Sequence, residues 1–370
     1  MPRRGEAFDY LFDLSLPGGK RGPVGISRLD SAIEAVVGKG GTQRSLTNSA
    51  ICVDLSRCRY IELDATLRMI PWLAELKRQG NSIRIVLPEL NNESVADSGL
   101  WSFLIRWRFF DALRRHVDAP ENLLSPSQID HLSEQSRYYQ RHTWDERGKR
   151  TLSFTSRLLA IHSLTLDSDF RLEDQVDAFL SEYRDLLVLR ALTQECGFED
   201  EEAYLSLSFI AEEGLLNSVA HAQGSFALVA MEIVDDLRFT DRPVLILSVA
   251  DNGVGIPQVL RIAKQEGRLK MSPLAKDDAD LLLLFTSFEL AQDSMLVAAS
   301  TRRNTTTVPE REGMGLFFLM ESAANIGARV NIRSGRANVR FDGRKHTRDD
   351  ERPYYPGTTL RVEIPIRRNR

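Results

Sequence analysis

The sequence predicts an α+β protein in which a smaller α/β domain precedes a larger domain of helices and mostly antiparallel strands. Two patterns lead to this prediction. A strand–helix–strand order runs through residues 50–88, and after about residue 165 long helical segments mix with strands of the antiparallel type. Of the 370 residues, 42% are hydrophobic and 27% are charged, which is ample apolar material for sizeable cores.

Composition excludes several classes of protein. The formal charge of −4 speaks against a globally basic nucleic-acid-binding protein. Three cysteines, Cys52, Cys58 and Cys196, are too few for a disulfide framework and lack zinc-ligand spacing. The uncharged run 214–231 is too polar to cross a bilayer, and no secretory signal opens the chain. We therefore expect a cytoplasmic protein with neither a membrane nor a nucleic acid as its partner.

The N-terminal half contains the smaller domain. Residues 1–45 are rich in turn-forming residues and are interpreted as an N-terminal extension. In the domain proper, residues 46–130, a strand at 50–56, a helix at 65–80 and a strand at 82–88 follow one another. This order predicts a parallel strand pair with a right-handed crossover.

An aromatic and arginine-rich segment, residues 100–118, ends this half. Such a composition could indicate a membrane surface or a nucleic-acid site, but we favour a helix that packs its apolar side chains into the domain core. The side chains expected in the core are Trp101, Leu104, Phe109 and Leu113. Residues 131–169 are interpreted as a linker or helical connection to the larger domain, residues 170–370.

The larger domain shows a long series of predicted elements. They are helices at 176–197, 201–222 and 315–327, and strands at 226–236, 243–252 and 358–366. The basic run 329–348, with seven Lys or Arg against one acid, is expected on a solvated hairpin, with a groove for DNA or RNA as the alternative.

A polar stripe lies on the predicted helix 201–222. Glu213, Asn217 and His221 follow one another at intervals of four residues, so their side chains share one helical face. A polar stripe in an otherwise apolar stretch needs partners. An amide oxygen suits Mg²⁺, and a carboxylate can orient or deprotonate a water molecule. The stripe indicates a metal–phosphate site or, taken alone, an exposed helix face.

A glycine-containing turn follows the buried strand pattern 244–250. Asp251 ends this strand, and Gly253, Gly255 and Ile256 follow it. A carboxylate at a strand end can accept a hydrogen bond from an exocyclic amine, and glycines allow a ligand close to the backbone. The alternative is an ordinary turn.

Two further motifs lie towards the C-terminus. One opens the predicted helix 315–327 and consists of Gly313, Met314, Gly315 and Leu316. Free N–H groups and the positive dipole end at such a helix start suit a phosphate. The other is a Gly-Thr-Thr sequence before the last strand, in which the Thr358 hydroxyl could complete a pocket for a base.

In this order, the four motifs resemble the ATP-binding domain of the GHKL superfamily, the Bergerat fold of gyrase, heat-shock chaperones, histidine kinases and mismatch-repair ATPases. EEGLLNSVAHA is similar to the N box, DNGVGI to the G1 box, GMGL to the G2 box and GTTL to the closing strand. The resemblance covers roughly residues 170–370. It implies a mostly antiparallel sheet with helices on one face.

The resemblance also implies ATP and Mg²⁺ as cofactors and a role for each matched residue. Glu213 would be the water-activating base, Asn217 the Mg²⁺ ligand and Asp251 the adenine anchor, while Thr358 would hold adenine through water. The other residues implied in nucleotide binding are His221, Gly253, Gly255, Ile256, Gly313, Met314, Gly315 and Leu316. Residues 257–312 would include a mobile ATP lid.

These implications predict an ATPase that hydrolyses ATP slowly and uses nucleotide state to control a partner protein in bacterial regulatory or stress signalling. The absence of an HExxRTP-like phosphoacceptor helix speaks against a conventional sensor histidine kinase. The alternatives are a protein kinase of the anti-sigma-factor or histidine-kinase type, a nucleotide-gated scaffold without turnover and a DNA-remodelling ATPase. Whether the protein forms a homodimer stays open.

The smaller domain resembles a STAS domain in its strand, Asp-centred turn, helix and second strand. In that family a phosphorylatable serine often follows the aspartate. Here Asp64 is followed by Ala65 and Thr66, so Thr66 is at most an off-register substitute. We favour an interaction module without phosphorylation.

Overall fold

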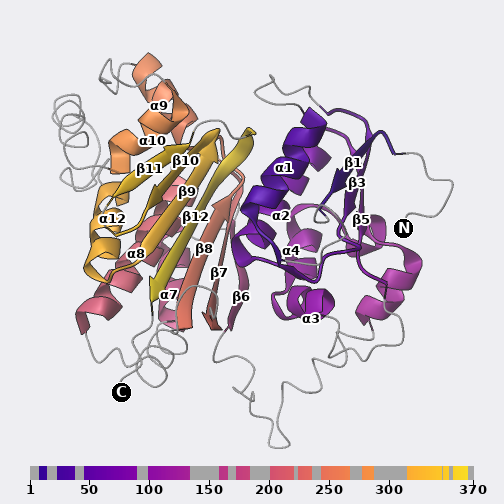
Figure 1. Ribbon diagram of the computed structural model, residues 1–370, viewed down its shortest axis with the longest axis horizontal. Coiled ribbons are helices and arrows are strands. Elements are labelled where there is room, and N and C mark those ends of the chain that lie inside the picture. Colours follow the sequence, from indigo (N-terminus) through magenta and orange to yellow (C-terminus); the bar gives the residue numbers. More distant parts are fainter. Residues whose placement is uncertain are drawn as a thin grey trace, which may run out of the picture. The chain divides into compact units, whose positions relative to one another are not determined.

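A computed structural model describes most of the chain (Figure 1). The described residues are 8–14, 23–37, 46–89, 99–133, 158–165, 172–183, 201–220, 224–235, 243–266, 277–286, 315–343, 345–349 and 353–365. The chain divides into two compact units, residues 1–162 and residues 163–370.

The first unit is built on a parallel sheet with the strand order β1-β3-β5. Its strands are β1 (Tyr10–Asp13), β3 (Ala50–Asp54) and β5 (Ser82–Val86). Helix α2 (Leu63–Arg78) connects β3 to β5, which pairs with β3 in parallel. The predicted strand–helix–strand unit is thereby confirmed.

The segment interpreted as an N-terminal extension contributes to this sheet. Strand β1 pairs in parallel with β3, and helix α1 (Ile26–Val37) contacts β1 and α2. A shorter parallel pair joins β2 (Pro23–Val24) to β4 (Tyr60–Ile61). The glycine and proline runs hid this structure, because the apolar spacing of α1 is short and lies between them. Much of residues 1–45 therefore belongs to the first unit.

A buried ion pair joins the two helices. Asp30 on α1 and Arg68 on α2 approach to 2.5 Å, and their side chains are 3% and 0% exposed. Thr66, two residues before Arg68 on α2, is also fully buried, and its hydroxyl donates to the carbonyl oxygen of Glu62 at 2.9 Å. The hydroxyl is thus already engaged inside the helix.

The aromatic segment forms two helices where one was predicted. They are α3 (Gly99–Arg106) and α4 (Phe109–His116), separated at Arg108, whose φ of 55° is left-handed. A short helix α5 (Pro120–Leu123) and a helical stretch at 126–133 follow. All four side chains expected in the core, Trp101, Leu104, Phe109 and Leu113, are buried. The interpretation as core helices is confirmed, apart from the break.

The second unit is built on a seven-stranded sheet with the order β11-β10-β9-β12-β8-β7-β6. Its strands are β6 (Leu158–Thr165), β7 (Phe226–Asp235), β8 (Pro243–Asp251), β9 (Arg329–Gly335), β10 (Ala337–Phe341), β11 (His346–Asp349) and β12 (Tyr355–Pro365). The pairs from β11 through β7 are antiparallel. The last strand, β12, therefore lies inside the sheet, between β9 and β8.

Helices pack against this sheet. They are α7 (Leu172–Tyr183), α8 (Glu201–Ala220), α9 (Ile256–Gln265), α10 (Asp278–Thr286) and α12 (Gly315–Asn325). Helices α8 and α12 contact each other and lie on the same face of the sheet (Figure 1). The α+β prediction is confirmed at this level, and the predicted elements match α8, β7, β8, α12 and β12 to within a few residues.

Two parts of the second unit differ from the predictions. Strand β6 lies in the stretch 131–169 that was interpreted as a linker. The basic run 329–348 does form a β9–β10 hairpin, but Arg333 is only 1% exposed. Its guanidinium donates to the carbonyl oxygens of Gly335 and Ala337 at 2.9 Å each, and to that of Pro353. Arg333 therefore ties the hairpin to the start of β12, and the run is not uniformly solvated.

Among the described residues, no helix combines the length and the apolar character that crossing a bilayer requires.

We expect Asp30→Ala to destabilise the first unit by about 3–5 kcal/mol, because it leaves the Arg68 guanidinium buried without its carboxylate. The matched control is Glu75→Ala, whose ion pair with Arg78 is exposed to solvent and should contribute less than about 1 kcal/mol. Urea unfolding followed by circular dichroism measures both. Equal effects of the two substitutions would contradict the structural role of the buried pair.

Candidate functional site

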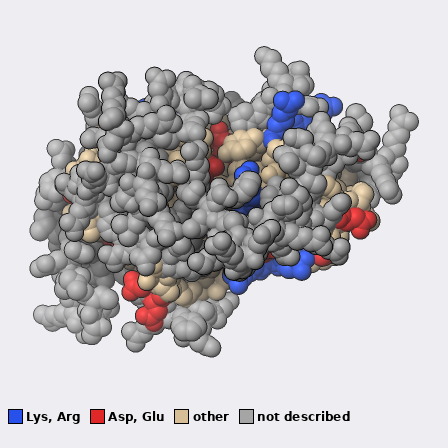
Figure 2. Space-filling model, turned by 90° about the horizontal axis from the view of Figure 1, so that it is seen from below, with Lys and Arg blue, Asp and Glu red and all other residues tan. Residues whose placement is uncertain are grey.

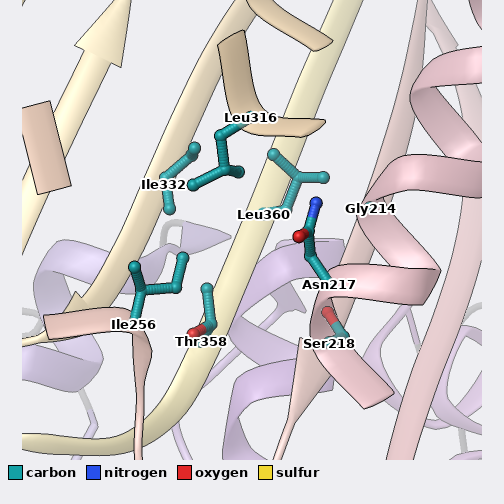
Figure 3. Close-up of a pocket in the computed structure, with 8 residues that line it drawn as sticks. All are labelled: Gly214, Asn217, Ser218, Ile256, Leu316, Ile332, Thr358 and Leu360. Atoms are coloured by element: carbon teal, nitrogen blue, oxygen red, sulfur yellow. The ribbon is translucent and has the colours of Figure 1, made fainter. Parts of the chain in front are cut away.

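The four motifs meet around one cavity in the second unit (Figure 3). Its empty volume is about 290 Å³, including space open to solvent. It is lined by Gly214, Asn217, Ser218, Ile256, Leu316, Ile332, Thr358 and Leu360. Four of these, Asn217, Ile256, Leu316 and Thr358, were predicted as site residues, one from each motif. The structure thus brings together segments that are more than 140 residues apart in the chain.

The carboxylate of Asp251 is fully enclosed beside the cavity. Asp251 ends β8 and is fully buried. Its Oδ1 accepts hydrogen bonds from the backbone N–H groups of Gly253 at 2.8 Å and Thr358 at 3.1 Å. Its Oδ2 is also buried, and no group among the described residues forms a hydrogen bond of normal geometry with it. Oδ2 therefore keeps the capacity to accept a hydrogen bond from a ligand, next to two residues that line the cavity, Ser218 and Thr358. The Ser218 hydroxyl lowers the pKa of the carboxyl but forms no hydrogen bond of normal geometry with Oδ2.

Burial sets the protonation of this group. Desolvation raises the pKa of Asp251 to about 7, although the hydrogen bonds from Gly253 and Thr358 and the nearby Ser218 hydroxyl lower it. Burial thus favours the protonated carboxyl far more than it is favoured in an exposed aspartate. A donor supplied by a ligand would favour the ionised form.

A glycine allows the tight crossing between β12 and the end of β8. Gly357 has a φ of +87°, and a Cβ at this position would overlap the carbonyl oxygen of Asp251 and lie 2.8 Å from its Oδ1. Because the two backbones approach so closely, the N–H of Thr358 can reach the Asp251 carboxylate. Packing therefore requires a glycine at position 357.

The polar stripe of α8 faces the start of α12. A Cβ at Gly315, the first residue of α12, would overlap Oε2 of Glu213 and lie 3.2 Å from Nδ2 of Asn217. That Nδ2 donates to the carbonyl oxygen of Glu213 at 2.7 Å, and the Asn217 carboxamide points into the cavity (Figure 3). Free N–H groups and the positive end of the helix dipole at the α12 start favour an anion there.

Two serines complete the site, and sequence reasoning missed both. Ser218 lines the cavity beside Asn217 and interacts with Asp251. Ser334, at the end of β9, accepts a hydrogen bond from the N–H of Ile256 at 2.8 Å, and its Oγ lies 2.8 Å from Oγ1 of Thr358. Ser218 could have been noticed because it follows Asn217 in the chain. Ser334 carried no signal, because only the strand order brings it to the site.

Helices α9 and α10 continue the segment after Ile256. Arg261 of α9 forms an ion pair with Asp278 of α10, and Asp280 pairs with Arg348 of β11. Asp278 also accepts a hydrogen bond from the N–H of Arg336 at 3.3 Å. The described parts of the expected lid, residues 257–312, are thereby tied to the β9–β10–β11 end of the sheet.

Several predicted site residues lie outside the described residues. These are His221, Gly313 and Met314, together with the polar run 300–312 of the expected lid. Gly253 and Gly255 are described, and they form the turn between β8 and α9.

In Figure 2 the Lys and Arg side chains of the described residues show as a few separate blue groups, and the Asp and Glu side chains as separate red groups. Within the described ranges, no three His, Cys, Asp or Glu side chains lie together in a way that could hold a metal ion.

We expect Gly357→Ala to destabilise the second unit strongly, because the new Cβ would overlap the carbonyl oxygen of Asp251. Gly327→Ala is the matched control, since Gly327 also has a positive φ, +65°, but nothing lies within 4 Å of its Cβ position. The control should lose only about 1–2 kcal/mol from backbone strain. Urea unfolding should show a clearly larger loss for Gly357→Ala, and equal losses would contradict the close crossing.

Comparisons with known proteins add little to this geometry. No protein-family model matches the chain, and no curated protein does. Among solved structures, it is similar to the histidine kinase domain from Erythrobacter litoralis EL346 blue-light activated histidine kinase, at 13% sequence identity and a TM-score of 0.23, over 82% of this chain and 92% of that chain. A TM-score this low carries no argument about shared function.

Proposed function

We propose that the second unit is a GHKL-type domain that binds ATP with Mg²⁺ in this cavity and hydrolyses it slowly. The observation that carries the proposal is the buried carboxylate of Asp251, which keeps an acceptor without a donor beside an apolar cavity. A buried acceptor of this kind is unfavourable unless a ligand completes it.

The adenine base suits the Asp251 side of the cavity. Its exocyclic amine would donate to Oδ2, whereas guanine presents a carbonyl oxygen at the same place and would be repelled by the carboxylate. The side chains of Ile256, Ile332 and Leu360 supply apolar walls for a flat ring.

The phosphates suit the other side, where α8 faces the start of α12. Asn217 would offer its amide oxygen to Mg²⁺, and Gly315, with Gly313, would leave room for phosphate oxygens at the helix start. When bound, Mg²⁺ would neutralise part of the negative charge of the phosphates. Glu213, whose carboxylate lies at this helix start, would take the proton of an attacking water molecule.

The remaining predicted residues keep their proposed roles. Gly253, Gly255, Ile256 and Thr358 would shape the adenine end, and Met314 and Leu316 the phosphate end. His221, which lies outside the described residues, keeps its predicted role in nucleotide binding. The first unit is proposed as a STAS-like interaction module that transmits nucleotide state to a partner protein. Because the Thr66 hydroxyl is buried and hydrogen-bonded, we do not propose it as a phosphorylation site.

We expect the full chain to bind ATP in the presence of Mg²⁺, and Asp251→Asn to abolish binding, because the amide would place a donor against the adenine amine. Affinity should also fall as the pH drops below about 7, because protonation removes the carboxylate acceptor, and it should level off above that pH. Isothermal titration calorimetry between pH 5.5 and 8.5 tests both. Asp342→Asn, on the exposed β10–β11 turn, is the control for the charge change. Full binding by Asp251→Asn would contradict the proposal.

For Glu213→Gln we expect loss of phosphate release with retained ATP binding, since the amide cannot accept the proton of the attacking water. Glu212→Gln is the matched control, because it makes the same change one residue earlier on α8 and should leave turnover intact. Release of inorganic phosphate from radiolabelled ATP measures turnover. Unchanged release in Glu213→Gln would overturn the assignment of the base, and label transferred to a protein instead would favour the kinase alternative.

A further inference from the structure

Ser334 connects three segments that the proposed site needs. Ser334 is the next-to-last residue of β9 (Arg329–Gly335), and its side chain is fully buried. Its Oγ contacts the N–H of Ile256 in the turn after β8, Oγ1 of Thr358 in β12 and the carbonyl oxygen of Gly357. Every one of these partners belongs to a motif of the proposed nucleotide site, and Ser334 itself has no assigned role.

The hydrogen-bond capacity of a hydroxyl limits how these contacts can be made. A serine hydroxyl has one proton to donate and two lone pairs to accept with. One lone pair is taken by the N–H of Ile256, at 2.8 Å. The proton can then go to Thr358 Oγ1, at 2.8 Å, or to the Gly357 carbonyl oxygen, at 3.4 Å. Only the shorter distance is typical of a good O–H···O hydrogen bond.

From this geometry we infer that Ser334 is a positioning residue, which donates to Thr358 Oγ1 and so leaves the Thr358 hydroxyl proton available to a bound base. The inference rests on the proposed function and deepens it. Thr358 lines the cavity, and its own N–H is already bound to the Asp251 carboxylate. The pair Asp251 and Thr358 therefore presents an acceptor and a donor side by side.

This pairing favours ligands that carry an amine next to a ring nitrogen. The acceptor takes an amine, and the donor takes a neighbouring ring nitrogen, directly or through one water molecule. Adenine carries a ring nitrogen on each side of its amine, N1 and N7. If Thr358 instead donated to Ser334, the site would present two acceptors and would gain nothing from a ring nitrogen.

Adenosine analogues that lack one ring nitrogen test the inference directly. We would measure binding of adenosine, 1-deazaadenosine and 7-deazaadenosine to the full chain by calorimetry, for wild type, Ser334→Ala and Ser248→Ala. Ser248 is the matched control, because it is a fully buried serine in the neighbouring part of the same sheet whose hydroxyl has no hydrogen-bond partner among the described residues.

In the wild type we expect one of the two analogues to bind about threefold to tenfold more weakly than adenosine, as one lost hydrogen bond implies. In Ser334→Ala this penalty should shrink to less than about twofold, because nothing then donates to Thr358 Oγ1 and the Thr358 proton is no longer held towards the base. Ser248→Ala should keep the wild-type penalty. An undiminished penalty in Ser334→Ala, or no penalty for either analogue in the wild type, would overturn the inference while leaving ATP binding intact.

A ligand-free measurement separates this inference from the proposed function. Ser334→Ala should increase hydrogen exchange at the Ile256 amide, and Ser248→Ala should not, because only Ser334 accepts from that amide. If the wild type bound no adenosine and the Ile256 amide still responded to Ser334→Ala alone, the contact would stand and the nucleotide proposal would be wrong. An unchanged Ile256 amide would contradict the positioning role itself.

Discussion

The burial of one carboxylate governs the organisation of the second unit. Asp251 is placed where β8 ends and β12 begins, and two backbone N–H groups hold one of its oxygens. That arrangement requires Gly357 at the crossing, because any side chain there would overlap the Asp251 backbone. A buried carboxylate with an unfilled acceptor is costly for folding. A carboxylate at this position is physically reasonable if it binds a ligand, because function then requires a group that lowers the stability of the fold.

The rest of the fold supports this crossing from both sides. Arg333 ties the β9–β10 hairpin to the chain just before β12, and the neighbouring Ser334 then reaches the turn after β8. On the other side of the cavity, α8 and α12 contact each other, and Gly315 lets the start of α12 approach Glu213. The proposed base end and phosphate end are therefore set by two separate packing contacts, which lie on either side of one small cavity.

Much of this site was predictable because its motifs are local. Asp251 follows an apolar strand pattern, and Asn217 lies one helical turn from Glu213, so strand ends and helix faces could be inferred from spacing alone. Ser334 and the buried Arg333 were not predictable, because their roles depend on which strands become neighbours. Arginine in a basic run is usually solvated, and nothing local marks one that binds three carbonyl oxygens. The placement of strands β1 and β6 was missed for the same reason, since sheet pairing decides it.

The most direct test of the account compares the stability of wild type and Asp251→Asn, with and without ATP and Mg²⁺, at pH 5 and pH 8. The raised pKa of Asp251 means that folding favours its protonated form, so this group destabilises the unit increasingly as the pH rises from about 4 to about 7. The account predicts that Asp251→Asn is the more stable protein without ligand, more so at pH 8 than at pH 5, and that only the wild type is stabilised by ATP. Equal stabilisation of both proteins by ATP, or a ligand-free variant less stable than wild type at pH 8, would contradict it.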